Sequence, residues 1–82
     1  MDKIKEILEN IPELPGVYLM KDKSGRIIYV GKAKILKNRV RQYFQNPEEK
    51  DPKTRTLVSK ISQIETIITK TESEALILEN TL

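Results

Sequence analysis

Residues 16–31 read GVYLMKDKSGRIIYVG, and this stretch decides the fold. It contains two runs of β-favouring residues, 17–20 and 27–30, on either side of a polar cluster at residues 22–25. Polar residues with a glycine between two such runs are typical of a tight turn. The stretch therefore predicts a β-hairpin, whose two strands run antiparallel.

Helical periodicity is present on both sides of the hairpin. Apolar residues three and four positions apart precede Pro12, and the same spacing returns in residues 35–44. Asp51 and Pro52 then form a good start for a short helix. We therefore expect one α+β domain over residues 1–82, with a small three-stranded, mostly antiparallel sheet flanked by helices. The predicted order is helix 4–11, hairpin 17–30, helix 35–44, helix 52–61, strand 63–71 and helix 72–82.

The composition excludes several kinds of site. The chain has 82 residues with no Cys and no His, so thiol catalysis, His-dependent triads and zinc centres are excluded. Catalysis would depend on Tyr, Lys, Arg, Ser, Thr and carboxylates, and a metal would need oxygen ligands, as Mg²⁺, Mn²⁺ and Ca²⁺ do. Apolar runs are at most four residues long. We therefore expect neither a membrane span nor a signal peptide, and a cytoplasmic protein.

Positive charge is concentrated in the middle of the chain. Residues 21–60 carry twelve Lys or Arg against four acids, a net charge of +8, whereas the whole chain carries only +3. The two flanking segments are mildly acidic. A basic centre suits a polyanionic partner, of which nucleic acid is the commonest, and the alternative is a solvated charged surface.

The second strand of the hairpin should alternate its side chains between two faces. We expect Ile27, Tyr29 and Gly31 to face one side, and Ile28 and Val30 the other. A glycine in a strand costs stability and often marks the close approach of a ligand or another backbone. The alternative is that Gly31 only begins the turn into the next helix.

The basic helix carries two polar side chains at the edge of its apolar arc. Arg39 and Tyr43 are separated by four residues and therefore lie side by side on the helix, where both could reach one phosphate. The alternative is that the aliphatic stem of Arg39 only covers the core.

The last helix places a carboxylate among apolar residues. On a helical wheel, Glu79 falls between Ala75 and Leu76, with Leu82 close by. A buried carboxylate is costly unless it is paired or metal-bound. We expect its partner to be either a Lys or Arg side chain or a divalent cation.

Two tripeptides in the hairpin form a paired signature, GVY at residues 16–18 and YVG at residues 29–31. With Val in place of Ile at both centres, this pair resembles the signature of the GIY-YIG nuclease family. The longer stretches LPGVY at 14–18 and YVGKAK at 29–34 resemble one branch closely, the N-terminal endonuclease domain of bacterial excinucleases of the UvrC type. Other residues of the family follow in order, at Lys32, Arg39, Tyr43 and Glu79.

The resemblance implies a metal-dependent DNA endonuclease with the GIY-YIG fold. It would make the incision on the 3′ side of a lesion in nucleotide excision repair, on double-stranded DNA presented by the excinuclease protein UvrB after UvrA has located the lesion. The chain would then be an N-terminal fragment of a longer multidomain protein. The family also supplies an asparagine beyond the last helix, and Asn80 does not stand at the matching place.

The resemblance also assigns roles at the reacting phosphate. Glu79 would hold one Mg²⁺, for which Mn²⁺ would substitute, and a single carboxylate fits an ion that keeps most of its waters. Tyr29 would orient and deprotonate the attacking water. Because a free phenol has a pKa of about 10, Tyr29 would need a lowered pKa, and we expect Lys32 beside it to supply that effect.

The remaining residues would hold the DNA. Arg39 would stabilise charge that develops on the phosphate, Tyr18 and Tyr43 would position the substrate and the attacking group, and Gly31 would leave room for backbone to approach DNA. We expect sequence-independent contacts to other backbone phosphates from three basic side chains, Lys34, Lys37 and Arg41.

Two alternatives remain open. The chain could be a DNA-binding module that has the fold and the basic face without the chemistry, in which case Glu79 would only form an ion pair. It could also be a stand-alone or homing GIY-YIG nuclease, although the residues from Lys32 to Lys34 favour the excinuclease branch.

Overall fold

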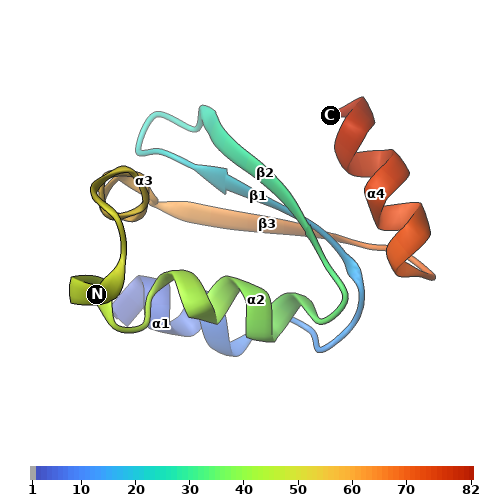
Figure 1. The fold of residues 1–82 in the computed structure, drawn as a ribbon, viewed down its shortest axis with the longest axis horizontal. Coiled ribbons are helices and arrows are strands. Elements are labelled where there is room, and N and C mark those ends of the chain that lie inside the picture. The colour runs from blue at the N-terminus through green and yellow to red at the C-terminus, as the bar shows by residue number, and fades with distance from the viewer. Residues whose placement is uncertain (1) are drawn as a thin grey trace.

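The computed structural model of the chain describes residues 2–82 (Figure 1). A short 3₁₀ helix, η1 (Pro47–Glu49), lies between the second and third α-helices. The other elements, in chain order, are α1 (Asp2–Glu9), β1 (Gly16–Lys21), β2 (Ile27–Ala33), α2 (Leu36–Tyr43), α3 (Pro52–Lys60), β3 (Gln63–Ile68) and α4 (Glu72–Thr81).

The three strands form one sheet in the order β2-β1-β3, with both neighbours antiparallel to β1. Residues 16–20 of this central strand are buried, as the apolar hairpin sequence predicts. The expected α+β fold with an antiparallel sheet is therefore confirmed. The third strand ends earlier than expected, at Ile68. Beyond it the Thr69 N–H donates to the Pro15 carbonyl, outside the strand ladder, and the chain turns into α4.

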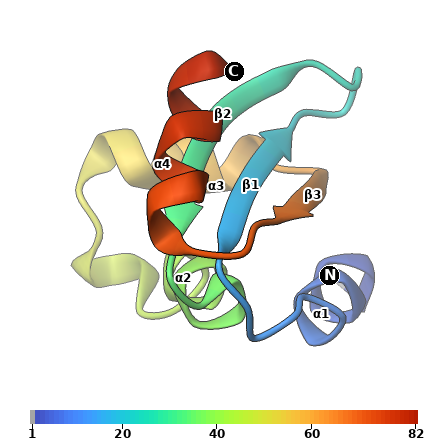
Figure 2. The ribbon, with the colours of Figure 1, turned by 90° about the vertical axis from the view of Figure 1, so that its right-hand side faces the viewer.

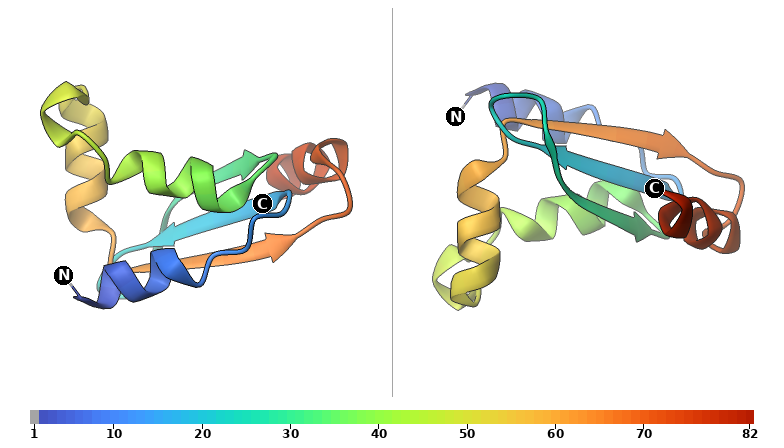
Figure 3. Two further views of the ribbon diagram at one scale, coloured as in Figure 1. Left: turned by 90° about the horizontal axis from the view of Figure 1, so that it is seen from below. Right: turned by 90° about the horizontal axis from the view of Figure 1, so that it is seen from above.

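Helices pack on both faces of the sheet. Below it in Figure 1, and in the left view of Figure 3, α1 and α2 lie side by side. Between these helices and the sheet lies the larger core, which includes Tyr18, Met20, Leu36, Val40 and Ile64. On the opposite face α4 crosses the sheet near β2 (Figure 2) and covers the smaller core of Val17, Leu19 and Ala75.

A register shift in the hairpin changes the expected alternation of β2. The pairing slips between Met20 and Lys21, so that Ile28 is the extra residue of a β-bulge. Ile28 packs on the α1 and α2 side, whereas Val30 packs on the α4 side. The expectation that these two residues share a face is therefore wrong, because a bulge interrupts the two-residue period.

The start of α3 follows its sequence signal. The Asp51 carboxylate accepts a hydrogen bond from the Thr54 N–H at 2.7 Å, and Pro52 occupies the first turn, where its missing N–H costs nothing.

Within residues 2–82, none of the helices has the length and apolar character needed to cross a membrane.

Candidate active site

The three tyrosines of the chain meet beside the sheet. Tyr18 comes from β1, Tyr29 from β2 and Tyr43 from α2, and their ring centroids are 5.9 to 6.1 Å apart. The hydroxyls of Tyr18 and Tyr43 are hydrogen-bonded at 2.8 Å. We refer to these three residues as the tyrosine cluster. Three residues that are distant in sequence thus present their phenols to one place, as the resemblance implies.

Strand register explains why Tyr18 and Tyr29 meet. Tyr18 pairs with Gly31 and Met20 pairs with Tyr29, so the two tyrosines are diagonal neighbours on one face of the sheet. Tyr18 is 1% exposed and Tyr29 is 40% exposed. The cluster therefore has a fixed inner phenol and an outer phenol that reaches solvent.

Gly31 is required by the ring of Tyr18. A Cβ atom at this position would overlap the Cζ and hydroxyl oxygen of Tyr18 and would lie 2.8 Å from its Cε1. Gly31 lies inside β2 and does not begin the turn to α2. The space on this side of Gly31 is filled by Tyr18, and the expectation that Gly31 leaves room for backbone to approach DNA stays a prediction.

Arg39 lies at the rim of the tyrosine cluster. Its guanidinium carbon is 5.8 Å from the centroid of the Tyr43 ring, within the range of a cation–π interaction. The neighbouring Tyr18 hydroxyl raises the pKa of Arg39 further, so this side chain is permanently charged. Arg39 is exposed, which leaves its charge available to a substrate.

The environment of the cluster keeps two phenols protonated at neutral pH. The Tyr43 hydroxyl, and then burial, raise the pKa of Tyr29 above its usual value of 10.0. Burial, and then the hydrogen bond with Tyr18, raise the pKa of Tyr43 to about 12. The cation that opposes these effects at both phenols is Arg39.

Lys32 does not lower the pKa of Tyr29, contrary to expectation. The strand continues to Ala33, so Lys32 pairs with Val17 and belongs to the face that α4 covers. Its ammonium lies 3.8 Å from the Glu72 carboxylate. The prediction failed because it ended the strand at Gly31. The strand in fact includes Lys32 and Ala33, and the alternation of side chains along it turns Lys32 to the face opposite the tyrosines.

Glu79 acts on Tyr29 through its charge and forms no ion pair within residues 2–82. Its negative charge is one of the influences that raise the pKa of Tyr29. Across residues 2–82 the ion pairs are Lys21–Glu65 and Lys32–Glu72, and Glu79 takes part in neither. Of the two partners expected for this half-buried carboxylate, the described residues therefore do not supply the Lys or Arg.

The three proposed phosphate contacts lie in different places. Lys34 is exposed and lines a hollow together with Asn38 and Arg39. The Lys37 ammonium donates to the Glu9 carbonyl at 3.2 Å and so fixes the end of α1 to α2. Arg41 lines a hollow between α1 and α2 together with Lys37. Of the three, Lys34 lines a hollow together with Arg39, and Arg41 lines another together with Gln42.

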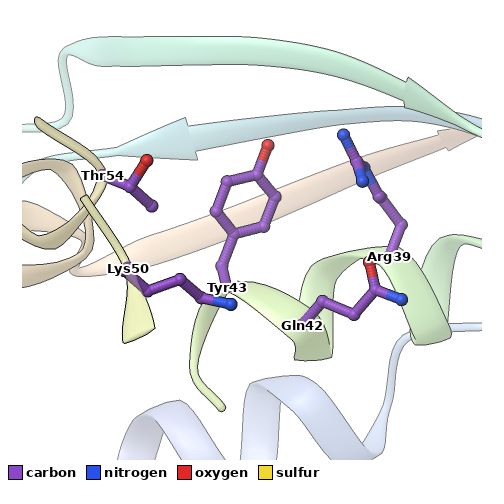
Figure 4. Close-up of a pocket in the computed structure, with 5 residues that line it drawn as sticks. All are labelled: Arg39, Gln42, Tyr43, Lys50 and Thr54. Atoms are coloured by element: carbon purple, nitrogen blue, oxygen red, sulfur yellow. The ribbon is translucent and has the colours of Figure 1, made fainter. Parts of the chain in front are cut away.

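Three polar residues that sequence reasoning missed lie beside Tyr43. Gln42, Lys50 and Thr54, with Arg39 and Tyr43, line a hollow of about 240 Å³ between α2 and the start of α3 (Figure 4). No periodicity could have indicated Lys50 or Thr54, since the turn around η1 brings them back toward α2. Gln42 could have been predicted from the sequence, because it lies three residues after Arg39 and therefore next to it on the helix surface.

Tyr43→Phe is expected to make stability less sensitive to alkaline pH. A phenol whose pKa is raised in the folded state ionises first in the unfolded chain, so stability is complete below pH 10 and falls as pH rises toward 12. We expect wild type to lose about 2 kcal/mol more than Tyr43→Phe over this interval. Urea unfolding below pH 10 and near pH 12 measures the difference. The lysines also titrate in this range, but their effect on stability is the same in both proteins and cancels in the comparison. Equal losses in the two proteins would contradict the raised pKa.

Comparison with known proteins identifies the family of the chain. The family model described as the UvrC-like GIY-YIG domain matches residues 14–82. UvrABC system protein C from Thermoanaerobacter sp. strain X514 is 62% identical over 76 residues, which cover 93% of this chain and 12% of that protein. The same protein from Carboxydothermus hydrogenoformans is 62% identical over 94% of this chain and 13% of its own length. The chain thus spans about an eighth of the length of these curated relatives.

A solved structure has the same fold. The crystal structure of the GIY-YIG N-terminal endonuclease domain of UvrC from Thermotoga maritima, bound to its catalytic magnesium, matches with a TM-score of 0.84 at 40% identity. The match covers 99% of this chain and 86% of that one. The chain therefore belongs to the UvrC-like GIY-YIG family of endonuclease domains.

Proposed function

We propose that this chain cuts DNA by metal-dependent hydrolysis of a phosphodiester, as the endonuclease domain of a longer excinuclease protein. One observation carries the proposal: three phenols and the charged Arg39 meet at one exposed site, and the charge of the half-buried Glu79 acts on the Tyr29 phenol. A module that only bound DNA would not need a half-buried carboxylate without a basic partner, because a negative charge weakens binding to a polyanion.

The donor set fits Mg²⁺. Within residues 2–82 there is no group of three or more acidic side chains that could form an all-protein cage. Mg²⁺ keeps several water ligands and is often held by one or two carboxylates, so Glu79 alone suits it, with Mn²⁺ as a substitute. When bound, the cation supplies a Lewis acid at the scissile phosphate.

The chain's own residues orient the reacting groups. Tyr29 is the most exposed phenol of the cluster and is placed to hydrogen-bond the attacking water, from which it can accept a proton only when it is ionised. Arg39 lowers the pKa of Tyr29, whereas Tyr43 and Glu79 raise it. Neutralisation of the Glu79 charge would therefore remove one of the influences that raise the pKa of Tyr29. Arg39 would also stabilise charge on the phosphate, and the Tyr18–Tyr43 hydrogen bond fixes the inner phenols.

The family suggests the biological setting. We propose that the full protein makes the 3′ incision at a lesion in nucleotide excision repair, in the bacterial cytoplasm, where the chromosome lies. Its substrate would be lesion-containing duplex DNA, presented by UvrB after UvrA has acted. The support is the identity of the curated relatives as UvrABC system protein C.

A paramagnetic titration tests the metal site directly. We expect Mn²⁺ added to ¹⁵N-labelled protein to broaden amide signals around Glu79, Tyr29 and Tyr18, and Glu79→Gln to abolish this broadening. Glu72→Gln, on the same helix but paired with Lys32, is the matched control and should keep it. Broadening at scattered acids such as Glu48 in both variants would contradict the one-carboxylate site.

A further inference from the structure

The polar hollow beside Tyr43, described above, borders the tyrosine cluster on the side of α3. We call it the Lys50 pocket, and its volume is about 240 Å³. Figure 4 shows the Tyr43 ring in its middle, with Lys50 and Thr54 on one side and Arg39 and Gln42 on the other. Two of its residues, Arg39 and Tyr43, also belong to the candidate active site. The pocket is therefore the immediate continuation of the site where the reacting phosphate would lie.

The chemistry of the pocket selects an anion. All five lining side chains end in groups that can donate hydrogen bonds, and none of them is a carboxylate. Neither Arg39 nor Lys50 takes part in an ion pair within the described part of the chain. The acidic residues of η1, Glu48 and Glu49, precede Lys50 but do not line the pocket. Two unneutralised cations among neutral donors are suited to a group with several acceptor oxygens, such as a phosphate.

The backbone around η1 holds the pocket in place. Asn46 adopts the left-handed conformation with φ 47° and ψ 60°, which reverses the chain after α2 and begins the short 3₁₀ turn. Asp51 then caps α3 by accepting the Thr54 N–H. Lys50 lies between these two fixed points and is half-buried. Because the backbone on both sides is already fixed, binding an anion would order little more than the Lys50 side chain.

We propose that the Lys50 pocket binds a backbone phosphate of the DNA next to the phosphate that is cut. This inference rests on the proposed function and adds the path of the substrate: from the tyrosine cluster the strand would run over the C-terminal end of α2 toward the start of α3. Lys37 lies away from this path, on the side of α1, whereas Arg41 in the last turn of α2 lines a neighbouring hollow with Gln42. Contacts of this kind are independent of sequence and set the register of the strand in the site.

Lys50→Gln is the direct test, with Lys53→Gln as its matched control. Lys53 carries the same charge on the first turn of α3, but it is exposed and does not line the pocket. Loss of one phosphate contact should lower the salt slope of duplex affinity by about 0.9 and weaken binding about eightfold at roughly 0.1 M salt. Fluorescence anisotropy of a labelled duplex over a salt series measures both quantities. Equal losses in the two variants would overturn the proposal, because they would reflect only the general field of the protein.

A second measurement separates this inference from the nuclease proposal. Inorganic phosphate added to ¹⁵N-labelled protein is expected to shift the amides of Gln42 and Thr54 in wild type and in Glu79→Gln, but not in Lys50→Gln. The pocket does not contain Glu79, so phosphate binding should survive even if that residue binds no metal. Shifts confined to Lys34 and Lys37, or no shift at Thr54, would overturn the pocket and leave the proposed hydrolysis standing.

Discussion

Glu79→Gln is expected to lower the rate of DNA nicking about a thousandfold while leaving the fold almost unchanged and without weakening the binding of DNA. A bound cation is worth several kcal/mol of charge stabilisation at a reacting phosphate, and each 1.4 kcal/mol is about tenfold in rate. Glu79 takes part in no ion pair within residues 2–82, so an amide of the same shape removes a charge without breaking a salt bridge. The effect should therefore fall on the chemistry.

The measurement is a time course of nicking on a lesion-containing duplex in the presence of Mg²⁺, UvrA and UvrB. Glu72→Gln serves as the control, because it removes a carboxylate from the same helix that is already paired with Lys32. A rate for Glu79→Gln within tenfold of wild type would refute the metal-binding role. An independent readout is the tyrosinate absorbance: without metal, the substitution should lower the pKa of Tyr29, since the Glu79 charge is one influence that raises it.

The order of elements could be predicted because it depends on local signals. The turn residues of the hairpin, the periodicity around Val40 and the Asp51 cap each act within a few positions, and the structure confirms all three. Which residues share a face depends on cross-strand pairing instead. For that reason the sequence could not predict the bulge at Ile28 or the continuation of β2 beyond Gly31.

The candidate site was predicted partly through the resemblance and partly through spacing. Spacing on α2 placed Arg39 beside Tyr43, and the cation–π contact agrees. Electrostatics could not be predicted in the same way, because proximity in sequence suggested Lys32 as the partner of Tyr29, whereas the folded chain places Arg39 there. Lys50 joins the site only through the path of the chain around η1.

Gly16→Ala is expected to destabilise the fold by about 3 kcal/mol, which is a large part of the stability of a domain of this size. A Cβ atom at Gly16 would overlap the backbone carbonyl oxygen of Ile67 in β3 and would lie 2.9 Å from the Leu36 Cδ1. A carbonyl in a paired strand cannot move alone, so β3 must shift away from β1, where Gly16 pairs with Ile68. Urea unfolding followed by circular dichroism measures the loss.

The other two glycines provide the comparison, because each meets a different obstacle. In Gly31→Ala the obstructing atoms belong to the Tyr18 side chain, so we expect a smaller loss of stability but displacement of the Tyr18 hydroxyl from Tyr43. Gly25 has open space around its Cβ position and a φ of 87°, so Gly25→Ala should cost about 1 kcal/mol of turn strain with no effect on the tyrosines.

Near-ultraviolet circular dichroism of the three tyrosines distinguishes these cases, since the chain contains no Trp. The tyrosine signal should change in Gly31→Ala at full helix content, persist in Gly25→Ala, and be lost in Gly16→Ala in the same early urea transition as the helix signal. A Gly31→Ala protein with an unaltered tyrosine signal would show that the Tyr18 ring can yield without leaving Tyr43. The structure implies two separate steric roles for the glycines of the paired signature: Gly16 allows the third strand to pack closely, and Gly31 leaves space for the Tyr18 ring. That result would contradict the role of Gly31.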